Sequence, residues 1–195
     1  EMDRPLGLAI GNALEVSESL EVLKGRGPED LKEVCIELAA NMLMLGGKGD
    51  LDHCRALALQ AVSDGSALRR FARMVQRQGG DPAVTEDPSR LPQASVQIEW
   101  QAAGAGYIHS MQAEKLGMAS LALGAGRKTK SDVIDPSAGI VLLKKTGDHV
   151  EAGEPLAVLH TSDRTRIDTA IEILKDSLLV MEEPPEQRPL ILGRV

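Results

Sequence analysis

Residues 144–163, KKTGDHVEAGEPLAVLHTSD, hold two polar turns, and apolar residues alternate between and after them. The first turn is centred on Gly147-Asp148, and the second is the run EAGE at 151–154. The apolar run PLAVL at 155–159 has the length of a strand and follows directly on turn residues. The stretch therefore predicts short strands joined by tight turns, which places β-structure in the second half of the chain.

This pattern resembles the second half of the domains that carry lipoate or biotin on a lysine at a hairpin tip. Two half-motifs of that kind lie at 104–110 and 139–160. A carrier joins its halves through a tight hairpin, whereas about 27 residues separate them here. Lys128 and Lys130 lie in this insert, but neither has the methionine or acid–aspartate neighbours of a carrier lysine. We therefore expect a carrier-like fold without a modified lysine.

The first 80 residues carry the periodicity of amphipathic helices. The run NALE at 12–15 is an Asn-led capping box, which predicts a helix capped by Asn12. A second helix is expected from Pro28 to Leu45, a third at 51–62, and a fourth that carries Leu68, Phe71 and Val75. These helices have apolar faces, but the segment has no sheet of its own for them to cover.

Residues 79–92 are rich in Gly, Asp, Pro and Ser, which is typical of a linker. Beyond them, strands are expected at 96–100, 107–108, 139–143 and 155–159, helices at 118–123 and 165–180, and a final edge strand at 190–192. The predicted fold class is α+β, with a helical part at 1–80, a linker at 81–94 and a β-rich domain at 95–195.

Charge and aromatic content limit the partners of the chain. It has 195 residues and a net charge of −7, and Phe71, Trp100 and Tyr107 are its only aromatic side chains. These features argue against nucleic acid or an anionic membrane surface as the main partner. Cys35 and Cys54 both fall on helical apolar positions, so we expect buried thiols in a reducing, cytosolic setting.

The sequence shows no signal-peptide pattern and no apolar run of spanning length. Its opening, EMDRP at 1–5, reads as neither a natural start nor a helix or strand. We therefore expect a cytoplasmic chain that forms part of a longer protein.

No catalytic constellation is visible in the sequence. The run LGAGRK at 123–128 lacks the third glycine of a dinucleotide fingerprint, because Thr129 stands there, and it does not fit a P-loop. We interpret it as a turn between structural elements. No serine elbow or Cys–His pair is evident, and the histidines lack metal-ligand spacing. The histidines, expected as surface or strand residues, are His53, His109, His149 and His160.

Four segments, taken in order, resemble the pyrimidine-nucleoside phosphorylases, which include thymidine phosphorylase. They are MDRPLGLAIGNALEVSESLEVLKGRGPEDL (2–31), SALRRFARMVQRQGGDP (66–82), LGAGRKTKSDVIDPSAGIVLLKKTGD (123–148) and VEAGEPLAVLH (150–160). These enzymes are homodimers with a helical domain, an α/β domain and a C-terminal domain of the carrier-like barrel-sandwich (hammerhead) type. The resemblance implies the helical C-terminal part of the α/β domain, followed by that C-terminal domain.

The family reaction is phosphorolysis of pyrimidine (deoxy)nucleosides to the free base and (2-deoxy)ribose 1-phosphate. In the family the phosphate- and base-binding residues precede the MDxPLG segment, so the resemblance assigns no catalytic or substrate-binding residue here. It implies a homodimeric full-length enzyme without an organic cofactor, and an inactive isolated chain. The alternative hypothesis is a non-catalytic binding module that retains the phosphorylase C-terminal lobe.

Some bacterial members of the family bind potassium beside the phosphate loop. Matched residue by residue, this chain supplies the main-chain carbonyls of Leu6 and Ala9 and the carboxylate of Glu18. A large, hard cation prefers several neutral oxygens with one acid, which fits this set. The family's other ligands lie upstream, and the alternative hypothesis is that Glu18 is a solvated helix residue.

Overall fold

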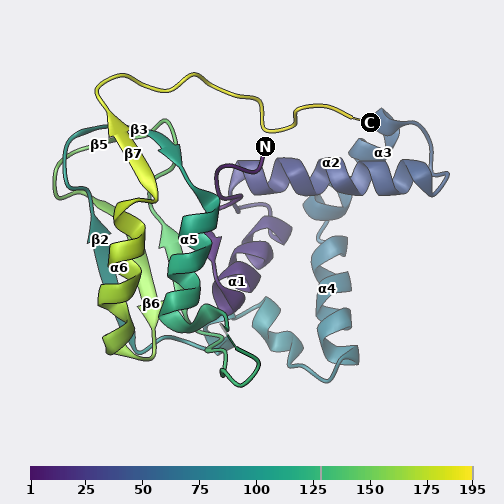
Figure 1. Ribbon diagram of the computed structural model, residues 1–195. Helices are drawn as coiled ribbons and strands as arrows, with labels where there is room; N and C mark the ends of the chain where they lie inside the picture. Colours follow the sequence, from purple (N-terminus) through teal and green to yellow (C-terminus); the bar gives the residue numbers. More distant parts are fainter. Residues whose placement is uncertain (128, 195) are drawn as a thin grey trace. The chain divides into compact units, whose positions relative to one another are not determined.

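The chain forms two compact units, and Figure 1 labels their helices and strands. The computed structural model describes residues 1–127 and 129–194. The larger unit comprises Glu1–Val16 and Pro92–Val195, and the smaller unit comprises Ser17–Leu91. None of the helices in the described residues has the length and apolar character that a membrane span requires. The fold is mixed α+β, as the sequence predicts.

Two antiparallel sheets form the framework of the larger unit. The first has the strand order β1 (Ala9–Ile10), β4 (Gly139–Leu142), β6 (Pro155–Thr161) and β2 (Val96–Gln101). The second has the order β5 (His149–Val150), β3 (Gly106–Met111) and β7 (Leu178–Met181). The strands that were expected around 96–100, 107–108, 139–143 and 155–159 are confirmed.

Strand β6, which follows the two polar turns, is an inner strand of the first sheet. Leu159 lies opposite Ile98 of β2 and Ile140 of β4, and it has no exposed surface. Leu156, Ala157 and Leu159 all belong to the buried core of this unit. An apolar run therefore forms a strand here because it pairs on both edges and packs against the core.

Both polar turns of the opening stretch are confirmed. The N–H of Asp148 donates to the carbonyl oxygen of Lys145 at 3.0 Å. The N–H of Glu154 likewise donates to the carbonyl oxygen of Glu151 at 3.0 Å. The third residue of each turn is a glycine with positive φ, which is the residue that a type II turn requires. Turn chemistry alone thus determines where these strands begin and end.

Helices α5 (Ala113–Ser120) and α6 (Ile167–Lys175) lie side by side over the strands of the larger unit, as Figure 1 shows. The buried residues of α6 are Ile167, Ala170 and Leu174, which follow the i, i+3, i+7 spacing of one helical face. A π-helical turn, Leu121–Ala125, continues α5. The helix expected at 118–123 is thus present, but it begins five residues earlier.

Two glycines allow β1 and β4 to approach closely. A Cβ atom on Gly139 would lie 2.4 Å from the carbonyl oxygen of Ile10, and one on Gly11 would lie 2.5 Å from that of Ala138. Gly11 also caps α1 (Asn12–Leu23), because its carbonyl accepts the first helical N–H, from Glu15. The carboxylate of Glu15 accepts from the N–H of Gly11 at 2.9 Å.

The predicted capping box is therefore wrong by one residue. The side-chain amide of Asn12 donates instead to the carbonyl of Ala125 at 3.5 Å, so it links two segments distant in sequence. The sequence signal was ambiguous because Gly and Asn are both acceptable N-cap residues. Because β1 pairs with β4 up to Ile10, the extended backbone ends at Gly11 and not at Asn12.

The smaller unit consists of helices. Besides the residues of α1 from Ser17 onward, it contains α2 (Glu29–Leu45), α3 (Leu51–Ser63), α4 (Ser66–Arg77) and the 3-10 turns Pro82–Thr85 and Pro88–Arg90. Helix α3 begins where Asp50 accepts from the N–H of His53 at 2.8 Å. Gly65, with φ of 71°, turns the chain from α3 into α4. The four predicted helices of this region are confirmed.

Three sequence expectations are wrong in detail. The closing helix ends at Lys175, because Ser177 bonds back to the carbonyl of Leu174 and residues 178–181 then pair with β3 as β7. Residues 190–192 form no strand. Cys54 is buried as expected, but Cys35 is exposed. The expected linker contains the boundary at Leu91, and residues 1–16 belong to the larger unit.

Candidate functional site

The proposed potassium ligands fall in two different units. Leu6 and Ala9 precede α1 in the larger unit, with Ala9 in strand β1, whereas Glu18 lies on α1 in the smaller unit. Within the described residues, no group of three or more His, Cys, Asp or Glu side chains is arranged to hold a metal ion.

The turn between Leu6 and Ala9 accepts a hydrogen bond from a charged lysine side chain. The ammonium group of Lys145 donates to the carbonyl oxygen of Gly7 at 2.8 Å. The neighbouring carbonyl of Leu8 accepts from the N–H of Leu142 at 2.8 Å, as part of the β1–β4 ladder. A metal ion at Leu6 and Ala9 therefore has to tolerate the positive charge of Lys145 nearby.

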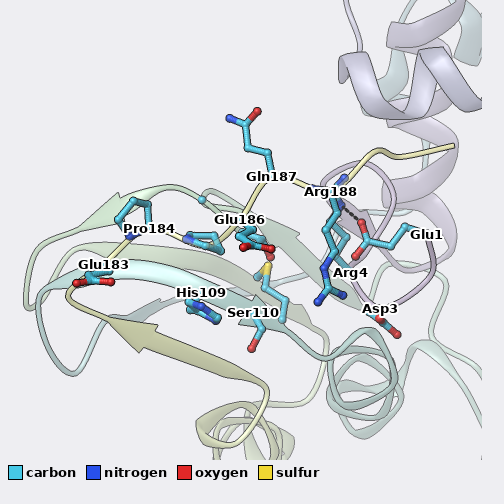
Figure 2. Close-up of a pocket in the computed structure, with 14 residues that line it drawn as sticks. Glu1, Asp3, Arg4, His109, Ser110, Glu183, Pro184, Glu186, Gln187 and Arg188 are labelled. Atoms are coloured by element: carbon cyan, nitrogen blue, oxygen red, sulfur yellow. Dashed lines mark ion pairs between the residues drawn. The ribbon is translucent and has the colours of Figure 1, made fainter. Parts of the chain in front are cut away.

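A second candidate site is a polar pocket of about 760 Å³ in the larger unit, shown in Figure 2. Strand β3 supplies His109 and Ser110, and residues 183–188 after β7 supply another wall. The N-terminal segment supplies Arg4, whose Nε atom lies 3.0 Å from a carboxylate oxygen of Glu1. The pocket thus lies between the N-terminal residues, strand β3 and the segment 183–188.

The pocket has mixed charge. Arg4, Arg188 and His109 face acidic side chains from both chain ends, so no single sign of charge dominates (Figure 2). The buried hydroxyl of Thr146, at its edge, has no hydrogen-bond partner. None of the described lining residues pairs a nucleophile with a base. The described lining residues therefore offer ionic and hydrogen-bonding groups to a small polar molecule.

The start of the LGAGRK segment, at Leu123 and Gly124, is held by a hydrogen-bonded cluster that sequence reasoning missed. One carboxylate oxygen of Asp135 accepts from the N–H and the hydroxyl of Ser137, at 2.9 and 2.6 Å. The other accepts from the N–H of Ser162 at 3.1 Å. Partial burial opposes ionisation of Asp135, but these hydrogen bonds outweigh it, so its pKa lies below the usual value.

This cluster has a structural role. The buried hydroxyl of Thr161 donates to the carbonyl of Leu123 at 2.7 Å, and the N–H of Asp135 donates to the carbonyl of Gly124 at 2.9 Å. LGAGRK therefore connects structural elements, as expected. Lys128 lies outside the described residues, and Lys130 is exposed. The D-x-S spacing at 135–137 was a local signal for the Asp135–Ser137 bonds, whereas Ser162 had none.

The histidines occupy ordinary positions. His109, His149 and His160 lie on strands, and His53 is exposed on α3, as the sequence predicted. The rings of His149 and Tyr107 meet edge to face, with centroids 4.9 Å apart. Burial lowers the pKa of His160, so this side chain is neutral at pH 7.

Comparison with known proteins shows two similarities. Residues 107–180 match the pyrimidine nucleoside phosphorylase C-terminal domain. The chain is also 45% identical, over 183 residues, to the pyrimidine-nucleoside phosphorylases of Staphylococcus aureus strains USA300 and NCTC 8325 / PS 47. The chain is thus similar to pyrimidine-nucleoside phosphorylases over most of its own length. The alignment covers 93% of this chain but 42% of each relative, so the chain spans less than half of their length.

The similarity spans residues of both units. The matched domain covers strands β3 to β7 with α5 and α6 between them, which lie in the larger unit. The longer alignment, over 93% of the chain, must also include helices of the smaller unit. The similarity to phosphorylases therefore extends over strands of the larger unit and helices of the smaller one.

Proposed function

We propose that this chain is the C-terminal part of a pyrimidine-nucleoside phosphorylase, which includes the thymidine-specific enzymes. The observation that carries the proposal is the 45% identity to curated phosphorylases over 93% of the chain. Its β-rich part then corresponds to the carrier-like barrel-sandwich domain of the family, and residues 1–80 correspond to the end of the α/β domain. The full-length enzyme is a cytoplasmic, homodimeric pentosyltransferase.

The proposed reaction is phosphorolysis. A phosphate oxygen forms a bond to C1′ of the nucleoside while the C1′–N1 bond breaks, and the base leaves with the electron pair and is protonated. Positive charge develops on the sugar and negative charge on the base, so the catalyst must supply donors for the base and align the phosphate. The described residues that line the pocket of Figure 2 do not form such a set.

The isolated chain is therefore proposed to be inactive. Removing one transition-state donor typically costs about 10²–10³ in rate, and here the whole set is assigned to the part outside this chain. The chain's own role is to form a wall of the closed active site and exclude water.

The test uses the purified 195-residue chain with thymidine or uridine, and with phosphate or arsenate as acceptor. We expect no release of free base above a buffer blank. A chimera, in which this chain replaces the matched residues of the S. aureus relative, is expected to release base. Turnover by the isolated chain refutes the assignment of the catalytic groups, and an inactive but folded chimera refutes the phosphorylase function.

We further propose that Leu6, Ala9 and Glu18 form half of a potassium site in the full-length enzyme. The support is chemical, because two neutral carbonyls and one carboxylate suit a large, hard cation. The test replaces Glu18 with Gln in the active chimera and titrates potassium. If activity and melting temperature keep their full potassium dependence, the assignment is wrong.

A further inference from the structure

An apolar groove of about 640 Å³ lies in the smaller unit. Helices α1, α2, α3 and α4 all line it. Apart from Ser19, Lys32 and the thiol of Cys35, every lining side chain is apolar. Lys32 is paired with Glu29 at 3.4 Å, so its charge is directed to a carboxylate of its own helix. The groove therefore suits an apolar partner and penalises a charged one.

One side of the groove continues as a regular seam on α2. Leu31, Cys35, Leu38, Met42 and Leu45 are separated alternately by four and three residues, which is the heptad spacing of helix–helix packing. The exposed fractions of Leu38, Met42 and Leu45 are 58%, 67% and 83%. Three large apolar side chains in one row are thus uncovered within this chain.

Helix α2 already uses a different face to pack within its own unit. Ile36 and Ala40 are buried, and so are Cys54 and Ala58 of the neighbouring helix α3. A helix with one apolar face suffices for a two-helix pair, so the exposed seam is a second apolar face. Contiguous exposed apolar surface of this kind marks an interaction site in most soluble proteins.

The source of a partner for the groove is inferred from the length of the phosphorylase relatives. This chain spans 42% of its phosphorylase relatives, so more than half of their length has no counterpart in it. We propose that the groove and the α2 seam bind an amphipathic helix from that other portion of a phosphorylase. The proposal rests on the proposed function. The heptad spacing favours a helix over a sheet as the occupant, because a seam with this period matches a second helix along its length.

The two cysteines provide a direct reporter. Cys35 lies in the groove and is exposed, whereas Cys54 is fully buried. Neighbouring apolar side chains desolvate the Cys35 thiol and raise its pKa, so alkylation is compared at one fixed pH. The probe is iodoacetamide, and the alkylated cysteine is identified by mass spectrometry. Cys54 serves as the internal control for global unfolding.

Alkylation is measured in the 195-residue chain and in the chimera with the S. aureus relative. We expect Cys35 to react at least about tenfold more slowly in the chimera, because labelling then requires the bound helix to open. The variant Met42→Glu is expected to restore fast labelling in the chimera and to leave the rate in the isolated chain unchanged. The matched control, Glu33→Lys, alters an exposed residue of α2 outside the seam and is expected to change neither rate.

Other outcomes overturn the proposal. Equal Cys35 rates in a catalytically active chimera refute the docking and leave the phosphorylase function intact. Protection of Cys35 in a chimera without activity supports the docking and refutes the function. If the isolated chain sediments as a dimer that Met42→Glu dissociates, a second copy occupies the seam and the proposal is wrong.

Co-expression keeps the test decisive when the chimera is insoluble. A tag on this chain is used to recover the other portion of the S. aureus relative. Recovery with the wild type and Glu33→Lys, but not with Met42→Glu, supports the proposal. Recovery with none of the three, or equally with all three, overturns it.

Discussion

Leu159 and Met42 show how differently the two units treat large apolar side chains. Leu159 lies on an inner strand of the larger unit and has no exposed surface, because its side chain packs in the buried core of that unit. Met42 lies on the longest helix of the smaller unit and is 67% exposed. A sheet covered by helices encloses a core within the chain, whereas the helices of the smaller unit leave an apolar groove open. The smaller unit thus carries the exposed apolar surface to which we assign a partner helix.

The largest expected effect tests the core of the larger unit. Replacing Leu159 with Ala removes a fully buried side chain and leaves a cavity, which costs about 2–5 kcal/mol of unfolding free energy. Trp100, the only tryptophan, lies on the paired strand β2, so its fluorescence during urea unfolding reports on this unit. We expect the urea midpoint detected by Trp100 fluorescence to fall, without a matching fall in the midpoint detected by helical circular dichroism.

A combined shift of both signals contradicts the comparison, because it means that the two units unfold as one. The control is Leu179→Ala on strand β7. This side chain is 51% exposed, so its loss is expected to change stability by less than about 1 kcal/mol.

A smaller effect is expected at the buried hydroxyl of Thr161. The change Thr161→Val keeps a similar shape but removes the donor to the carbonyl of Leu123. An unpaired buried carbonyl costs about 1–3 kcal/mol, measured by the same fluorescence-detected urea unfolding. Retention of wild-type stability shows that water or another donor satisfies Leu123, and that the Thr161 contact does not anchor the π-helical turn.

The carboxylate of Asp135 is expected to make the free energy of unfolding depend on pH. Because hydrogen bonds lower the pKa of Asp135 in the folded chain, the unfolded chain binds the proton more readily. The resulting stability is present above the pKa of about 3.8 that an unperturbed aspartate has, and it is lost as pH falls through the lower folded value.

The variant Asp135→Asn is accordingly expected to lose about 1–2 kcal/mol at pH 7, since the charge-assisted bonds to Ser137 and Ser162 weaken. At pH 2 to 3 the variant and the wild type are expected to converge. Thermal unfolding across pH 2 to 7 measures both effects. A constant difference across that range contradicts an ionised Asp135.

The smallest effect is expected at Met42, and it sharpens the comparison most directly. The change Met42→Ala in the isolated chain is expected to alter unfolding free energy by less than about 0.5 kcal/mol, because the side chain is 67% exposed. Circular dichroism at 222 nm during urea unfolding measures it. A cost of 2 kcal/mol or more, typical of a core position, means that Met42 is covered in the isolated chain.

Much of the fold was accessible from the sequence because its signals are local. The turns at 147–148 and 151–154, the apolar run of β6 and the periodicity of α2 each depend on residues a few positions apart. The resemblance to pyrimidine-nucleoside phosphorylases also came from short contiguous segments, and comparison with known proteins confirmed it. The absence of a catalytic set from the motifs was likewise a local observation.

Other features depended on contacts between residues far apart in the chain. The cap of α1 is Gly11 and not the predicted Asn12, because β1 pairs with residues near 140. Helix α6 is shorter than predicted, because residues 178–181 pair with β3. The bond from Ser162 to Asp135 spans 27 residues and had no local signal. Periodicity, finally, showed that α2 has apolar positions all along one side, but it did not distinguish covered positions from exposed ones. Local signals in the sequence by themselves determined most of the helices and strands. Burial depends on which elements pack together, so only the tertiary structure showed that the α2 seam is open.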